Sequence, residues 1–111
     1  MFESKAWSTE LGGSAMNTIR TLSMLGVNTG FAGAIGKDKY GGIIKNRMEE
    51  LGVEHHLTEE DAPSGTCVVF ITPDGERTMA TNLGANSLYR EEHLPLDVVR
   101  NSKILHFSGY F

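Results

Sequence analysis

Helical and strand-like spacings of apolar residues alternate along the first half of the chain. From residue 14 to residue 25 the apolar positions recur at helical spacing, and Gly26 stands where a glycine commonly ends a helix. Residues 27–34 form a run of small and apolar residues that predicts a buried strand. This first part of the chain therefore predicts a helix followed by a strand.

The same order then repeats. Residues 40–51 carry a second apolar stripe at helical spacing, preceded by Asp38, a common N-cap residue, and followed by Gly52. Residues 53–57 read as a short strand. Two helix–strand units in succession predict a parallel sheet whose strands are joined by crossover helices.

The second half of the chain breaks this order with a hairpin. Residues 66–72 are rich in β-forming residues, and residues 77–83 are expected to return antiparallel to them. The turn Pro73-Asp74-Gly75-Glu76 between them supplies a fixed φ and then a glycine able to adopt positive φ. A short helix over residues 91–101 and a buried strand over residues 104–107 are expected to follow. The fold class is therefore α/β, with a parallel sheet, flanking helices and a projecting antiparallel hairpin.

The net charge and the composition limit the classes of molecule that the chain is expected to bind. A net charge of -4 argues against nucleic acid or an acidic membrane surface, because both need a basic face. No run of about 18 apolar residues is present, so no membrane-spanning helix is expected. One cysteine, Cys67, and an N-terminus unlike a signal peptide favour a reducing, cytoplasmic location. His55 and His56 should point to opposite faces of a strand, so no metal site is expected.

The run Gly12-Gly13-Ser14-Ala15-Met16-Asn17 is the strongest candidate for a binding site. Paired glycines let a ligand approach the backbone, and the helix that follows directs free N–H groups and its positive end at the same space. Asn17, in the first helical turn, offers a donor and an acceptor, which suits a ligand with several hydroxyl groups. The alternative is a glycine-rich turn that only begins a helix.

The same run resembles the first signature of the PfkB, or ribokinase-like, family of carbohydrate kinases. The signature's later glycines match Gly26 and Gly36, although Ile19 departs from the small residue that the family prefers. The run from Gly12 to Arg20 is most similar to adenosine kinases. Three more runs resemble the family: Ile35-Gly36-Lys37-Asp38-Lys39-Tyr40-Gly41, Ser64-Gly65-Thr66-Cys67 and Asn82-Leu83-Gly84-Ala85-Asn86.

The resemblance implies a partial ribokinase-like fold in which residues 1–111 form the substrate-binding region, with a lid at about residues 64–84. It implies that a sugar or nucleoside, with adenosine-like substrates favoured, is bound by Gly12, Gly13, Ser14, Asn17, Leu83 and Phe111. It also implies that Arg77 approaches the transferred phosphate and that Cys67 contacts the substrate from the lid. The alternatives are a solvated charge for Arg77, a core aromatic for Phe111 and a small buried side chain for Cys67.

The family's catalytic aspartate lies in a Gly-Ala-Gly-Asp motif that this sequence lacks. Gly84-Ala85-Asn86 is only superficially similar, because Asn cannot act as a base. We therefore assign no catalytic residue and expect ATP and Mg²⁺ to bind elsewhere in the full-length enzyme. The chain is expected to be the front part of an ATP-dependent kinase, inactive alone. Two alternatives stay open: a non-catalytic sugar- or nucleoside-binding module, and an interaction domain whose lids pair in a homodimer.

Overall fold

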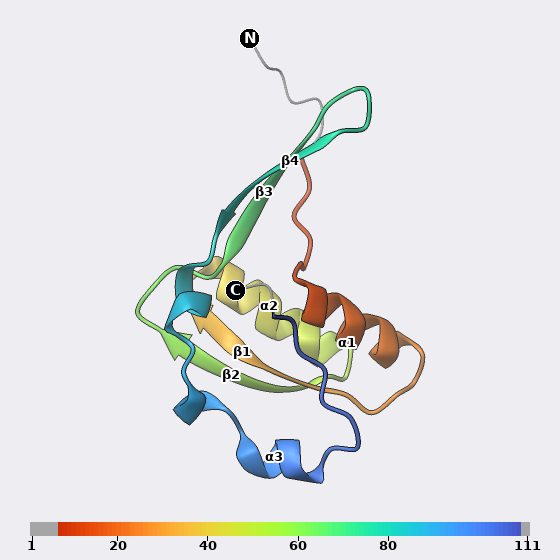
Figure 1. The fold of residues 1–111 in the computed structure, drawn as a ribbon, viewed down its shortest axis with the longest axis vertical. Coiled ribbons are helices and arrows are strands. Elements are labelled where there is room, and N and C mark those ends of the chain that lie inside the picture. The colour runs from red at the N-terminus through yellow and green to blue at the C-terminus, as the bar shows by residue number, and fades with distance from the viewer. Residues whose placement is uncertain (1–6, 110–111) are drawn as a thin grey trace.

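The computed structural model describes residues 7–109 and confirms the predicted α/β fold (Figure 1). A parallel two-stranded sheet is flanked by helices, and an antiparallel hairpin projects from this body. The elements are α1 (Ser14–Met24), β1 (Gly30–Gly36), α2 (Lys39–Glu50), β2 (Glu54–Glu60), β3 (Thr66–Ile71), β4 (Arg77–Asn82) and α3 (Leu96–Asn101), with 3₁₀ turns η1 (Gly84–Leu88) and η2 (Glu91–His93). None of the helices in the described residues has the length and apolar character needed to cross a membrane.

The strands β1 and β2 pair in parallel and are joined by α2, as the repeated helix–strand order predicted. Gly30 lies opposite Glu54 at one end of the ladder, and Gly36 lies opposite Glu60 at the other. The first strand begins three residues later than the apolar run suggested, and the second extends three residues further, to Glu60. The predicted glycine endings are confirmed, because φ is 84° at Gly26 and 69° at Gly52.

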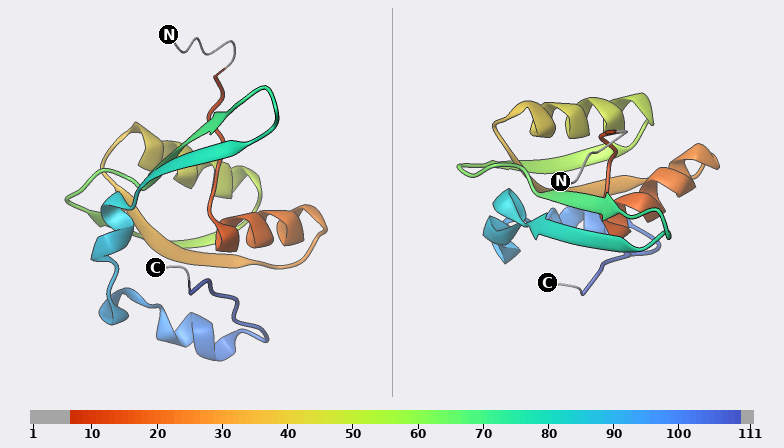
Figure 2. Two further views of the ribbon diagram at one scale, coloured as in Figure 1. Left: turned by 45° about the horizontal axis from the view of Figure 1, so that its top comes forward. Right: turned by 90° about the horizontal axis from the view of Figure 1, so that it is seen from above.

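Both long helices meet the sheet through one hydrophobic core. Its buried centre consists of Met16 from α1, Met48 from α2 and Val53 before β2. Met48 is fully buried. Partly buried apolar side chains surround this centre: Leu11, Ile19, Phe31, Ile44, Leu51 and Leu57. Figure 2 shows the two helices beside the β1–β2 sheet from two further directions.

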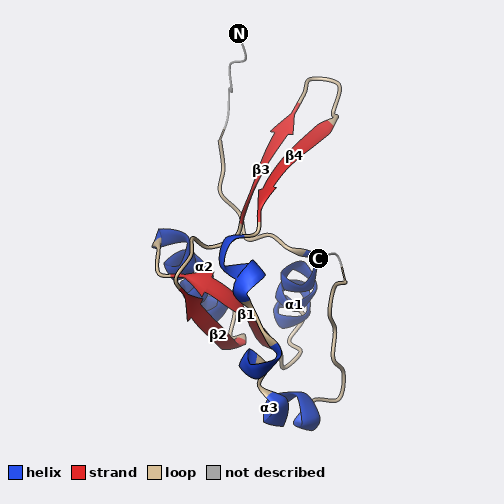
Figure 3. Cartoon of the chain, turned by 60° about the vertical axis from the view of Figure 1, so that its left-hand side comes forward, coloured by secondary structure: helices blue, strands red, loops and turns tan. Residues whose placement is uncertain are grey.

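The β3–β4 hairpin stands apart from that core (Figure 3). Thr66 lies opposite Asn82 at its base and Ile71 opposite Arg77 near its tip. The tip turns at Gly75, whose φ of 87° is the positive value that the Pro-Asp-Gly turn predicted. Every residue of β4 is exposed, so the hairpin is held to the body at its base.

The C-terminal part differs from the expectation in two ways. The single helix predicted over residues 91–101 is divided into η2 and α3 at Pro95, which lacks a backbone N–H and disfavours helical conformation in the residue before it. The strand predicted over residues 104–107 is wrong: these residues form no strand, and Ile104 and Phe107 are 87% and 77% exposed. Within the described residues β1 pairs with β2 alone, so this segment joins no ladder that would bury it.

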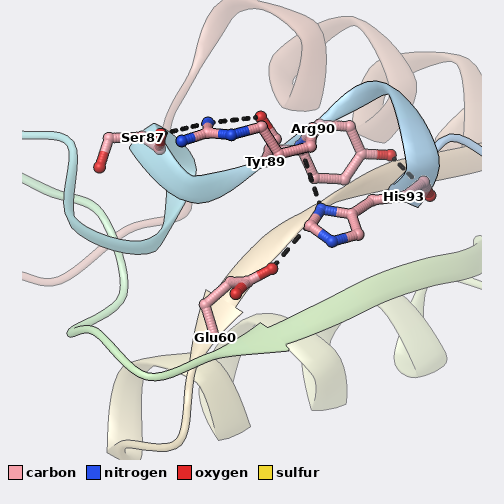
Figure 4. A network of polar contacts seen from close by, with 5 residues as sticks. All are labelled: Glu60, Ser87, Tyr89, Arg90 and His93. Carbon is pink, nitrogen blue, oxygen red and sulfur yellow. Dashed lines mark hydrogen bonds and ion pairs between the residues drawn. The ribbon is translucent and has the colours of Figure 1, made fainter.

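A polar network joins the two 3₁₀ turns to the end of β2 (Figure 4). The Arg90 backbone N–H donates to Nδ1 of His93 at 3.0 Å, and Oε1 of Glu60 lies 3.5 Å from the same nitrogen. The Tyr89 hydroxyl donates to the His93 carbonyl at 3.2 Å, while the Arg90 guanidinium donates to the Ser87 carbonyl at 2.9 Å. Burial raises the pKa of Tyr89, which favours the protonated hydroxyl that donates to His93.

Candidate functional site

The N-terminus of α1 is formed by the diglycine run and faces open space. Gly13 occupies the N-cap position with φ 94°, a conformation that side chains rarely adopt. A Cβ atom built on either Gly12 or Gly13 would meet no atom within 4 Å. No side chain caps this helix end, and its first turn contains no acidic residue. A ligand can therefore reach the first-turn amides and the positive end of the helix dipole.

Asn17 lies one turn further along the same open surface. Its side chain is exposed, and with Thr18, Thr21 and Leu22 it lines a shallow surface hollow that is largely open to solvent. Its Oδ1 accepts a hydrogen bond from the Arg20 guanidinium at 3.3 Å. Since this contact is exposed and long, it leaves the amide available to a bound molecule.

The predicted site residues fall on two parts of the structure. Gly12, Gly13, Ser14 and Asn17 come together at the start of α1. Arg77 and Cys67 lie on the hairpin and are both exposed, and Leu83 is partly buried at its base. Cys67 is exposed, so the alternative of a buried cysteine is wrong. Its Sγ atom accepts a hydrogen bond from the Thr81 hydroxyl at 3.3 Å. Phe111 lies outside the described residues.

A buried polar cluster at the hairpin base was not anticipated as a functional feature. Ser64 is 1% exposed, and its hydroxyl donates to the Asp38 carboxylate at 2.7 Å while accepting from the Gly36 N–H at 2.9 Å. Several hydrogen bonds hold the pKa of Asp38 below its ordinary value, and the one from the Ser64 hydroxyl has the largest effect. The sequence offered one indication of this cluster, because residues 35–41 and 64–67 both resemble the family. It did not show that these two runs lie in contact.

The described residues do not supply a metal centre. They include no group of three or more His, Cys, Asp or Glu side chains that could hold a metal ion.

The chain has an α/β fold with a small parallel sheet and a projecting antiparallel hairpin. Its candidate site is the exposed N-terminus of α1, which two glycines precede. Residues 1–111 match the family described as pfkB family carbohydrate kinase. The chain belongs to this family.

The relatives include both sugar and nucleoside kinases. An uncharacterised sugar kinase, YegV, of Escherichia coli (strain K12) is 32% identical over 108 residues, which cover 97% of this chain and 34% of that protein. Adenosine kinase 2 of Arabidopsis thaliana is 36% identical over 108 residues, covering 90% of this chain and 31% of the relative. The chain thus spans about a third of the length of these curated relatives.

Solved structures agree with this assignment. The adenosine kinase of Sinorhizobium meliloti aligns with a TM-score of 0.75 and 34% identity, covering 83% of this chain and 29% of that one. A ribokinase from Giardia lamblia aligns with a TM-score of 0.78 over 92% of this chain and 37% of that one. At 22% identity the second match supports the ribokinase-like fold alone.

Proposed function

We propose that the chain is the substrate-binding part of an ATP-dependent kinase that phosphorylates a hydroxyl group of a sugar or nucleoside. The observation that carries this proposal is the open start of α1. There the glycine-led turn leaves backbone amides accessible and Asn17 lies beside a hollow. Vicinal hydroxyls need donors and acceptors side by side, and free amides next to a carboxamide offer both.

An adenosine-like substrate is favoured over a simple sugar. The support is the run from Gly12 to Arg20, which resembles adenosine kinases, together with the identity to two Arabidopsis adenosine kinases, 36% and 38%. The sugar kinases among the relatives are 32% identical or less, a small difference. Both substrate classes therefore belong in the test.

In this proposal the chain's residues bind and orient the hydroxyl. The backbone at Gly12, Gly13 and Ser14 and the amide of Asn17 hold the ligand. ATP supplies the phosphoryl group when it is bound by the full-length enzyme, and the proton acceptor also lies outside this chain. The amides of this chain keep the attacking oxygen in place, which is the main contribution a protein makes to phosphoryl transfer.

The hairpin is proposed to act as a lid at about residues 64–84. When it closes, Leu83 and Cys67 approach the substrate and Arg77 approaches the transferred phosphate. Closure excludes water, which would otherwise compete for the phosphoryl group. Phe111 is proposed to stack against the base of a nucleoside.

A panel of adenosine, ribose and fructose tests the proposal on the full-length protein. The variant Asn17→Ala should raise KM for the preferred substrate about 3- to 10-fold, the loss expected for one hydrogen bond. The control is Asn46→Ala, which removes another exposed helical carboxamide, on α2. Unchanged kinetic constants in Asn17→Ala would reject the assigned role, and failure to phosphorylate any of the three would reject the proposed substrate classes.

A second candidate is an interaction function of the hairpin. Val69 and Met79 lie directly opposite each other in the ladder and are 43% and 63% exposed. Exposed apolar pairs of this kind favour contact between two copies of the chain, so we propose a homodimer formed through the hairpins. A strictly monomeric species in sedimentation would count against it.

The lone Cys67 is compatible with the cytoplasmic location that we also propose.

A further inference from the structure

Three family-like runs that are far apart in the sequence meet at the base of the hairpin. The first run, at residues 35–41, contributes the end of β1 and the start of α2. The second, at residues 64–67, leads into β3, and the third, at residues 82–86, leaves β4. None of them lies at the start of α1, so their convergence needs a separate explanation.

Asp38 connects the first two runs through both of its carboxylate oxygens. Oδ2 accepts the Ser64 backbone N–H at 2.8 Å, and Oδ1 accepts the Ser64 hydroxyl at 2.7 Å and the Gly41 N–H at 2.8 Å. The Ser64 hydroxyl in turn accepts from the Gly36 N–H at 2.9 Å. Because Ser64 is buried, water does not compete strongly for these bonds.

The two arms of the hairpin base are locked to each other. The Ala85 N–H donates to the Pro63 carbonyl at 2.7 Å, and Ala85 is fully buried. A Cβ atom on Gly65 would lie 2.8 Å from the Leu83 carbonyl oxygen, so the arms touch through backbone. Asp38 fixes the arm that leads into β3 to α2. The arm that leaves β4 is held against the first arm by the contacts just described.

Beyond this base most residues of the hairpin are exposed: all of β4 and most of β3. A largely exposed two-stranded ribbon depends strongly on its attachment for its direction.

We propose that Asp38 is a positioning residue that sets the direction in which the β3–β4 hairpin leaves the body, acting through Ser64. The role in catalysis rests on the proposed function, because it assumes that the hairpin closes over a substrate. The orientation itself needs no substrate and can be measured without one.

Replacement of Asp38 by asparagine would disturb this arrangement with little change in size. Asp38 receives three hydrogen bonds on its two oxygens. An Asn side chain replaces one of these oxygens with an NH₂ group, which would face a donor N–H or O–H. The variant Ser64→Ala removes the hydroxyl bonds and keeps the backbone bond. The matched control is Asp97→Asn, which makes the same chemical change at an exposed position on α3.

Spin labels at Asn46→Cys on α2 and Glu76→Cys near the tip, in a Cys67→Ala background, report the hairpin's direction by pulsed electron resonance. We expect a narrow distance distribution in the parent chain, a distribution about twofold broader or displaced in Asp38→Asn and Ser64→Ala, and no change in Asp97→Asn. Unchanged distributions in both base variants, with the core folded by circular dichroism, would overturn the proposal.

Loss of the core is a separate outcome that the variants distinguish. If Asp38→Asn unfolds, the milder Ser64→Ala decides. If Ser64→Ala also loses its core, the cluster supports the whole domain and does not orient the hairpin, and the proposal is overturned. In the full-length enzyme Asp38→Asn and Ser64→Ala should lower kcat/KM severalfold, in proportion to the broadening of the distance distribution. If the cluster only stabilised the fold, kcat/KM of the folded fraction would not change. The distance result is independent of the Asn17→Ala test, so failure of either proposal is seen separately.

Discussion

Gly41, in the first turn of α2, packs directly against the carbonyl oxygen of Gly36 at the end of β1. A Cβ atom on Gly41 would approach this oxygen to less than 3.0 Å, a separation that real side chains essentially never show. A Cβ atom on the next residue in the helix, Gly42, would meet no atom within 4 Å. Two adjacent glycines therefore have opposite requirements.

The first prediction compares alanine at these two positions. Gly41→Ala should lower the free energy of unfolding by about 1–3 kcal/mol because the methyl group overlaps backbone that cannot move aside. Gly42→Ala should raise it by about 0.5–1 kcal/mol, since alanine loses less conformational entropy in a helix. Urea denaturation of both variants measures the difference. Equal shifts would contradict the close approach.

The second prediction concerns pH. The folded chain holds the pKa of Asp38 below its ordinary value of 3.8, chiefly through the Ser64 hydroxyl and the Gly41 N–H. As the pH falls, the unfolded chain therefore takes up a proton at Asp38 before the folded chain does. The stability that this carboxylate contributes is fully present above the ordinary value and is lost as pH falls through the lowered one.

Urea denaturation of the parent chain and Asp38→Asn between pH 6 and pH 2 tests this expectation. The parent should be more stable by about 1–2 kcal/mol at pH 6, and the difference should shrink below about pH 4. Asp97→Asn serves as the comparison at an exposed carboxylate on α3. A difference that stays constant down to pH 2 would mean that the Asp38 charge does not stabilise the fold.

The third prediction addresses Arg77 in the full-length enzyme. If this exposed hairpin residue reaches the transferred phosphate on closure, Arg77→Ala should lower kcat roughly 10- to 100-fold and raise KM less. Arg77→Lys should retain part of the rate because it keeps the charge, and Arg100→Ala, on α3, should have no effect. An unaltered rate in Arg77→Ala would identify the side chain as a solvated charge.

The fourth prediction is that the 111-residue chain alone does not turn over ATP. It contains no Gly-Ala-Gly-Asp motif, the run that carries the catalytic aspartate in the family that it resembles. Incubation with ATP, Mg²⁺ and the substrate panel should give no product above background, with the full-length protein as the active control. Clear activity would show that a proton acceptor and phosphate site exist within these residues.

Local chemistry was enough to predict the elements whose ends are set by single residues. Asp38 caps α2 as expected, with its Oδ1 accepting the Gly41 N–H, and Gly26 and Gly52 end the two long helices with positive φ. The hairpin followed from its turn, since Gly75 adopts the positive φ that the turn requires. These signals lie within a few residues of the structure they determine.

Contacts over longer separations were not predictable from the pattern. Residues 104–107 are apolar enough for a buried strand, but burial depends on a neighbouring strand and a covering layer, which composition does not reveal. Similarly, Asp38 was expected only as a helix cap. Its two bonds to Ser64 span 26 positions, so no local rule pointed to them.

The backbone contacts at the hairpin base have a consequence for how this sequence can diverge. Gly36, Gly41, Gly65 and Gly84 each press against the backbone or side chain of another segment, so no single one of them can gain a side chain unless its neighbour retreats at the same time. Accepted change at this junction would have to occur in pairs. The exposed part of the hairpin beyond this junction does not carry that requirement, so its residues can change one at a time while the junction stays constant.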